Sequence, residues 1–236
     1  LYFLFFLTLI FSNKQFNYKM IGLTYSGDGR INSQGNIKDL LLKVFILYSV
    51  LSLIIFLLLN ISNIRMFNSL NLSMSLISAG GFLPTNSLDK IIYSNLQKII
   101  LIFSLLVSIL NFFLILNIFE KKIIVREHKE DFYLIMISLV FILLIYLNNN
   151  SVLNITISVL SSLGNSGLTL INSDNNLSLY FILIVAIGGS LVSNTSGIKF
   201  TRIYILIKTA SSEINKLISP NSIINKNLLS SEKKIT

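Results

Sequence analysis

Two short glycine turns carry the residues of this sequence best suited to chemistry. The first is Ala79-Gly80-Gly81-Phe82, and the second is Gly164-Asn165-Ser166-Gly167. Each turn follows twelve residues that interleave Ser, Asn or Thr with Leu and Ile, namely Met66–Ile77 and Val152–Leu163. A helix ends with a partial negative charge of about −0.5, and the residues just after it have carbonyls without helical partners. Two such ends are predicted to bind a dehydrated cation through carbonyl oxygens.

The segments around these turns are predicted to be membrane helices. Runs of roughly 20 apolar residues span a bilayer, and four such runs occur at Leu40–Leu59, Asn95–Phe119, Phe132–Leu147 and Leu177–Ile198. A helix of twelve residues rises about 1.5 Å per residue and cannot cross a hydrocarbon core of roughly 30 Å. Because each twelve-residue segment lies between two spans, we expect both to be re-entrant half-helices.

The order span, half-helix, glycine turn and span occurs twice. Gly81 and Gly167 are 86 residues apart, and the spans that begin at Asn95 and Leu177 are 82 residues apart. A nearly constant period is typical of an internal repeat. The simpler alternative is the alternation of spans and loops in any multi-pass protein, but it does not account for two short polar helices that both end in glycine.

Composition independently indicates an all-α integral membrane protein. Of the 236 residues, 53% are hydrophobic and only 12% are charged, whereas a soluble domain has about 25% charged residues. The absence of cysteine and the single histidine, His128, exclude thiol chemistry and a clustered soft-metal site. The sequence has no nucleophile–base constellation, phosphate loop or hydride-cofactor fingerprint. We therefore expect a protein that is not an enzyme.

The positions of the basic residues predict the orientation in the membrane. If the segment before Leu40, the loop at 121–131 and the C-terminal tail are cytoplasmic, that side has 16 of the 19 Lys and Arg residues. The other side has the remaining three, Arg65, Lys90 and Lys98. Basic residues collect in cytoplasmic loops. Both half-helices are then expected to enter from the outside, with their C-terminal ends pointing inward.

Three motifs resemble the bacterial Trk/Ktr-type potassium-uptake membrane subunits. Ser78-Ala79-Gly80-Gly81-Phe82, followed by Pro84-Thr85, is similar to the filter turn of that family's second repeat. Gly164-Asn165-Ser166-Gly167-Leu168-Thr169 is similar to the filter turn of the third repeat. A third motif resembles the Gly-rich break in the third repeat's second membrane helix; it comprises Gly188-Gly189-Ser190, Ser193-Asn194-Thr195-Ser196-Gly197-Ile198-Lys199 and Arg202. The resemblance covers roughly residues 15–221.

The resemblance implies a potassium pathway at the centre of four repeats in one polypeptide, with one filter glycine per repeat. By position, the implied potassium-binding residues are Ser78, Ala79, Gly80, Gly81, Gly164, Asn165, Ser166 and Gly167. The implied intramembrane gate loop comprises Gly188, Gly189, Ser190, Asn194, Thr195, Ser196, Gly197, Lys199 and Arg202. Lys199 and Arg202 would act on the ion path or gate; alternatively, they end a span and reach the cytoplasmic headgroups.

The resemblance also implies partners and a location. It implies a multi-pass protein of the bacterial plasma (inner) membrane that forms a homodimer and binds a cytoplasmic nucleotide-binding regulatory subunit. Potassium would be the transported ion, and the only metal bound would be K⁺ at the filter carbonyls, without a cofactor. Membrane lipid is expected next to the basic tail, and nucleic acid is not expected as a partner.

The predicted organisation has four parts and leaves two functions open. Residues 1–39 would be the end of a truncated membrane helix and a cytoplasmic linker, 40–122 and 123–208 two membrane-pore-membrane repeats, and 209–236 a cytoplasmic tail. Half a ring of carbonyls cannot replace the hydration shell of potassium, so the chain alone is expected not to conduct selectively. It is therefore either a pore-forming subunit, or a piece of one, for passive potassium uptake, or a non-conducting truncated or structural membrane protein that needs the missing repeats.

Overall fold

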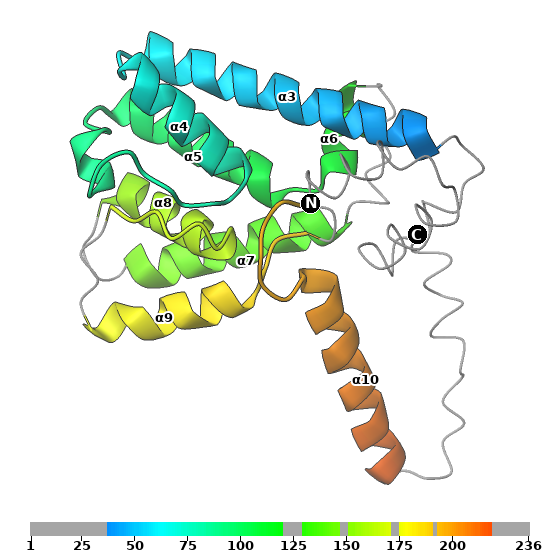
Figure 1. The fold of residues 1–236 in the computed structure, drawn as a ribbon. Helices are drawn as coiled ribbons and strands as arrows, with labels where there is room; N and C mark the ends of the chain where they lie inside the picture. Colours follow the sequence, from blue (N-terminus) through cyan, green and yellow to red (C-terminus); the bar gives the residue numbers. More distant parts are fainter. Residues whose placement is uncertain (1–36, 120–128, 147–150, 171–174, 191–192, 219–236) are drawn as a thin grey trace.

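The computed structural model describes residues 37–119, 129–146, 151–170, 175–190 and 193–218. The helices are α3 (Ile37–Ile61), α4 (Met66–Ile77), the short 3-10 helix η2 (Leu88–Lys90), α5 (Asn95–Ile109), α6 (Phe112–Phe119), α7 (Lys129–Tyr146), α8 (Val152–Leu163), α9 (Asn175–Ala186) and α10 (Phe200–Ile218) (Figure 1). Within these ranges the only β-type pairing is one isolated parallel bridge between Ile187 and Ile198. The predicted all-α class is confirmed.

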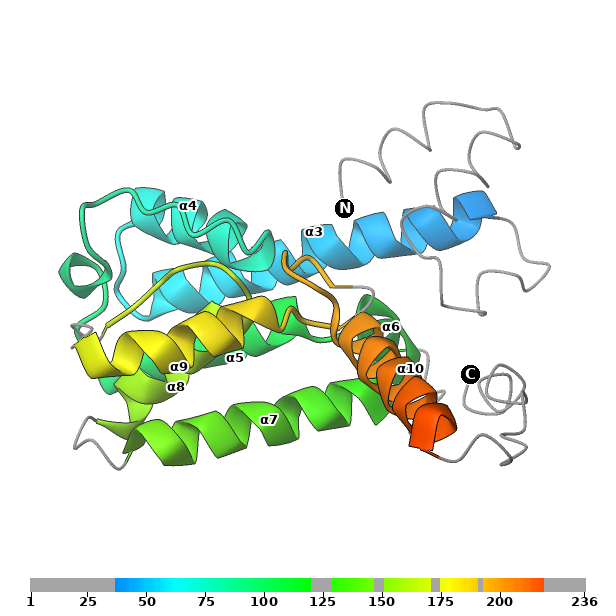
Figure 2. The ribbon, with the colours of Figure 1, turned by 90° about the horizontal axis from the view of Figure 1, so that it is seen from below.

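The predicted unit of helix, half-helix and helix occurs twice, as α3–α4–α5 and α7–α8–α9. The half-helices α4 and α8 begin and end at the predicted residues. In both views α5 and α8 lie in the middle of the bundle, and α3 lies on the side away from α7 (Figures 1 and 2). The last helix, α10, points away from the bundle and contacts it through α7 (Figure 1).

Two of the predicted spans are single helices. The span Leu40–Leu59 lies within α3, and Phe132–Leu147 corresponds to α7 as far as Tyr146. Among the described residues, α3 is the one helix long and apolar enough to cross a membrane, over Leu42–Ile61. The helices α5 and α8 are apolar but shorter.

The prediction of one continuous span over Asn95–Phe119 is wrong, because the chain breaks between α5 and α6. Leu110 has the extended dihedrals φ −70° and ψ 159°. The amide of the next residue, Asn111, donates to Oδ1 of Asp131 at 3.0 Å, and both residues are buried. In a continuous helix that amide would bond four residues back; here a carboxylate from α7 accepts it instead.

The prediction of one continuous span over Leu177–Ile198 is wrong as well. The helix α9 ends at Ala186, and the described residues of the Gly-rich segment, 187–190 and 193–199, are not helical. Gly188 N donates to the carbonyl of Ile198 at 2.9 Å, so the first and last residues of this segment lie side by side. The segment therefore forms a closed loop rather than the second half of a membrane helix.

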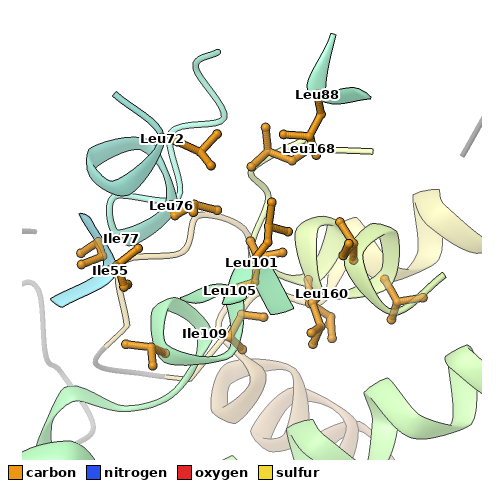
Figure 3. Close-up of a cluster of buried hydrophobic side chains, with 14 of the residues drawn as sticks. Ile55, Leu72, Leu76, Ile77, Leu88, Leu101, Leu105, Ile109, Leu160 and Leu168 are labelled. Carbon is orange, nitrogen blue, oxygen red and sulfur yellow. The ribbon is translucent and has the colours of Figure 1, made fainter. Parts of the chain in front are cut away.

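An aliphatic core joins the two repeats across α5. Leu101 and Leu105 of α5 are fully buried, and they lie between the side chains of α4 and those of α8 (Figure 3). The first repeat contributes Leu76, and the second contributes Leu160. Burial of aliphatic side chains on both sides of α5 holds the two half-helices at fixed positions, and so places their C-terminal turns.

The outer faces of α3 and α7 remain apolar and exposed. Leu53 of α3 is 57% exposed, and Leu143 of α7 is 66% exposed; similar exposure occurs at Ile46 and Leu139. Soluble monomers seldom expose continuous apolar faces of this kind. Contact with lipid hydrocarbon accounts for such faces.

The start of α5 provides a test of stability away from the glycine turns. Ser94 Oγ accepts a hydrogen bond from Gln97 N at 3.2 Å, and Gln97 Oε1 accepts one from Ser94 N at 3.1 Å, which forms a capping box. We expect Ser94→Ala to lower the free energy of unfolding by about 1 kcal/mol, as measured by denaturation in detergent followed by circular dichroism. Ser211→Ala, at an exposed position of α10, is the control and should leave the free energy of unfolding unchanged. Equal losses of stability in the two variants would contradict the prediction.

Candidate cation pathway

The half-helix α4 ends in a Schellman turn. Ala79 N donates to the carbonyl of Leu76 at 3.2 Å, and Gly80 N donates to the carbonyl of Ser75 at 2.9 Å. These are the two bonds that define the motif, with Ser78 as the C-cap. They satisfy two of the last carbonyls of the helix and turn the chain sharply away from the helix axis.

The half-helix α8 ends in the same turn, 86 residues later. Asn165 N donates to the carbonyl of Ser162 at 3.1 Å, and Ser166 N donates to the carbonyl of Ser161 at 2.9 Å. The hydroxyls of Ser161 and Ser166 also lie 3.0 Å apart, which adds a side-chain link that the first turn lacks, because Gly80 stands at the place of Ser166. The internal repeat therefore extends to individual backbone hydrogen bonds.

Positive φ angles occur at the same two positions in each turn. They are 53° at Ala79 and 69° at Gly81 in the first turn, and 55° at Asn165 and 69° at Gly167 in the second. For a residue with a side chain this conformation costs about 1–2 kcal/mol, so Ala79 and Asn165 are strained and are held by the Schellman bonds.

The two turns contact each other at Gly81. A Cβ atom on Gly81 would overlap the carbonyl oxygen of Ser166, so the backbone of the second turn occupies the space where a side chain would be. The C-terminal ends of α4 and α8 therefore converge, each with its partial negative charge. At Gly167 no atom of the described residues lies within 4 Å of the corresponding Cβ position.

The predicted gate loop, of which residues 188–190 and 193–199 are described, is anchored to the end of α5. Ser190 N donates to the carbonyl of Ile109, the last residue of α5, at 3.1 Å. Gly189 N donates to Oγ1 of Thr195 at 3.0 Å, which joins the two arms of the loop. A Cβ atom on Gly189 would lie 2.9 Å from the carbonyl oxygen of Ile109, so glycine permits this close approach.

The same loop reaches both glycine turns. Asn194 Nδ2 donates to the carbonyl of Ile77, the last residue of α4, at 2.8 Å. Near the second turn, Nδ2 of Asn165 lies 2.6 Å from the position that a Cβ of Gly197 would take. The structure thus brings together two turns that are 86 residues apart in the sequence and a loop that begins 21 residues after Gly167. It places the two predicted filter turns against each other and the predicted gate loop against both.

Lys199 and Arg202 have different surroundings although they are three residues apart. Lys199 Nζ donates into the loop, with its shortest hydrogen bond, 2.6 Å, to the carbonyl of Thr195. Arg202 lies on α10 with an exposed side chain. Of the two basic residues predicted for the gate loop, only Lys199 thus bonds to the loop. Ser196, also predicted for the loop, has an exposed side chain.

One residue at this site escaped the sequence predictions, and another was part of the quoted motif without a role of its own. The second is Ser193, which is 1% exposed and accepts a hydrogen bond from Lys199. Asp131, 2% exposed, receives the amide of Asn111 at the break after α5. Its sequence signal was weak, because a carboxylate at the start of an apolar run is usually a solvated helix end. No group of three or more His, Cys, Asp or Glu that could hold a metal ion occurs within the described ranges.

Comparisons with known proteins agree with this arrangement. No protein-family model matches the chain. It is 28% identical over 197 residues to an uncharacterized cation transporter of Methanocaldococcus jannaschii, a match that covers 80% of this chain and 40% of that protein. Its structure resembles the crystal structure of the potassium transporter TrkH from Vibrio parahaemolyticus with a TM-score of 0.72 and 20% identity, over 94% of this chain and 51% of TrkH.

The chain therefore spans about half the length of the proteins it matches, or less. Both are named as transporters and neither as an enzyme, in agreement with the prediction. The resemblance that the three motifs predicted is confirmed: the described part of the chain is helical and has a TrkH-like fold.

Proposed function

We propose that this chain supplies part of a pathway for passive cation transport, with potassium as the ion. In this proposal the carbonyls at Ser78–Gly81 and Gly164–Gly167 replace part of the hydration shell of the ion, and the loop from Gly188 to Gly197 lies below them as a gate. The observation that carries the proposal is the direct contact of the two glycine turns, in which the backbone of Ser166 fills the side-chain position of Gly81.

Electrostatics supports a cation at this place. The C-terminal ends of two helices meet there, and each has a partial charge of about −0.5. Cations are favoured at such ends, more strongly where water is excluded. In the described residues neither half-helix has a charged side chain. Backbone carbonyls and the helix ends would therefore provide the attraction, as they do in ion filters.

The expected environment and partners follow from the same proposal. The protein would be a multi-pass protein of the plasma membrane, with both half-helices entering from the outside; the bacterial inner membrane stays a prediction. The division into residues 40–122 and 123–208 as repeats and 209–236 as a tail also stays a prediction, although α10 continues through residue 208 to Ile218. The homodimer and the cytoplasmic nucleotide-binding regulatory subunit are proposed partners.

Complementation tests the proposal. The chain is expressed in a bacterium that lacks potassium uptake, alone and together with the gene segments that flank it, and growth is measured at low potassium. Because two filter turns form only part of a ring, we expect rescue to need the flanking segments. Rescue in neither arrangement would refute potassium conduction and favour the alternative of a non-conducting structural protein. A chain with Ser94→Ala should keep the rescue, as a matched control outside the turns.

A further inference from the structure

The ammonium group of Lys199 donates hydrogen bonds to oxygens of two residues in the described part of the loop. Its Nζ lies 2.6 Å from the carbonyl oxygen of Thr195 and 3.3 Å from that of Ser193. It lies 3.1 Å from Oγ of Ser193 and 3.2 Å from Oγ1 of Thr195. Four oxygens thus face one ammonium, which has only three protons to donate. Both Ser193 and Thr195 are buried, with 1% and 5% exposure.

The hydroxyl protons of this oxygen cage all point away from the ammonium. Ser193 Oγ donates its proton to the carbonyl of Ser190 at 2.7 Å. The 2.8 Å contact between Ser193 Oγ and Thr195 Oγ1 must then use the proton of Thr195. Thr195 Oγ1 also accepts from Gly189 N at 3.0 Å. Each hydroxyl oxygen is left with one lone pair, and that lone pair is directed at Lys199 Nζ. The cage presents only acceptors.

We propose that the carbonyl and hydroxyl oxygens of Ser193 and Thr195 form a binding site for a dehydrated monovalent cation, in which the Lys199 ammonium takes the place of a potassium ion. Ammonium and potassium ions have the same charge and similar size, and carbonyl and hydroxyl oxygens are ligands for both. A spherical ion can use all four oxygens, whereas the ammonium must share one proton between two of them.

The position of the cage links it to the glycine turns. Asn194 lies between the two cage residues, and its side chain bonds the carbonyl of Ile77 at the end of α4. A tethered ammonium here would occupy a cation position next to the proposed filter. This last consequence rests on the proposed function, but the existence of the binding site does not.

Removal of the ammonium tests the site by a stability measurement that does not depend on transport. The full chain with Lys199→Met is purified in detergent, and its melting temperature is compared in potassium chloride and in N-methyl-D-glucamine chloride at equal ionic strength. We expect potassium to raise Tm of this variant by about 3–5 °C more than that of the unchanged chain, at a concentration tenfold above the dissociation constant. Lys199→Ala, which leaves more room for the ion, is a second variant and should respond in the same way.

Two controls locate the effect. Lys208→Met removes a lysine on α10 whose ammonium lies over the ring of Tyr204, outside the cage, and should show no added response to potassium. Adding Thr195→Val to Lys199→Met removes one cage oxygen and should abolish most of the gain. If both Lys199 variants melt at equal temperatures in the two salts, or if Thr195→Val leaves the gain intact, the proposed site is refuted.

The two proposals can fail separately. A potassium-dependent Tm in Lys199→Met, together with no growth rescue in any arrangement, would retain the cation site and reject the transport function. Growth rescue without a potassium-dependent Tm in either Lys199 variant would retain the transport function and reject the cation site.

Discussion

Gly81→Ala is expected to destabilise the chain by at least about 4 kcal/mol, a loss characteristic of a defined structural conflict. The added Cβ would overlap the carbonyl oxygen of Ser166, which belongs to backbone held by the bond from Ser166 N to the carbonyl of Ser161. The positive φ of 69° adds about 1–2 kcal/mol of strain. Because neither turn can move without breaking Schellman bonds, the contact between the turns should be lost. Thermal denaturation in detergent followed by circular dichroism would measure the effect.

Gly167→Ala is the matched control. Gly167 has the same φ of 69° at the equivalent place of the second turn, but no atom of the described residues lies near its Cβ position. We expect only the conformational strain of about 1–2 kcal/mol there. Equal losses in the two variants would show that strain alone decides the effect, and would contradict direct contact between the turns. In a chain that conducts, Gly81→Ala should also abolish rescue of potassium uptake.

The half-helices were predictable to the residue because local signals agreed. Serine and asparagine among aliphatic residues gave each twelve-residue segment a mixed polar and apolar composition. Glycine, alanine or asparagine followed at the positions where the chain must turn. Schellman turns depend on local hydrogen bonds and on a residue in the left-handed region, so the sequence contains most of the information. The 86-residue offset between Gly81 and Gly167 then extended the prediction from one turn to the other.

The breaks in the longer helices were not predictable in the same way. Apart from Asn111, apolar character continues from α5 into α6, and one asparagine in such a run does not by itself mark Leu110 as a helix end. The cause is tertiary: Asp131 of α7 accepts the amide of Asn111. The end of α9 is different, because its glycines were visible and resembled a known break. The apolar run Leu177–Ile198 suggested a continuous span. In the structure, the hydrogen bond from Gly188 N to the carbonyl of Ile198 brings the two ends of a loop together instead.

The composition of the site was predictable, but its contacts were not. The motifs identified which turns and which loop would matter, and the structure brings those segments together. Which residue joins one segment to another depends on side-chain reach. Asn194 Nδ2 donates to the carbonyl of Ile77, which is 117 positions away in the sequence. Lys199 Nζ donates to Ser193 and Thr195, whereas Arg202 is exposed. Spacing alone cannot distinguish the two basic residues.

Asn194→Ala is expected to loosen the loop from the first glycine turn. The variant removes the hydrogen bond of 2.8 Å between Nδ2 and the carbonyl of Ile77, which is worth about 1 kcal/mol. Local opening of the loop should then be about fivefold more frequent. The amide of Gly189 is bonded to Thr195 within the loop, and that of Ser190 is bonded to the carbonyl of Ile109 at the end of α5. Hydrogen exchange of these two amides would report the change as faster exchange by the same factor.

Asn71→Ala separates this effect from the general loss of an asparagine. Asn71 Nδ2 also donates to a backbone carbonyl, that of Phe67 at 2.9 Å, but within α4 itself. Because that bond lies within a single helix, its loss should leave the exchange of Gly189 and Ser190 unchanged. If both variants exchange alike, Asn194 does not hold the loop to the half-helix. If only Asn194→Ala accelerates exchange, the gate loop and the first glycine turn are coupled through one amide, and in a conducting assembly the same variant should raise potassium flux without altering the filter turns.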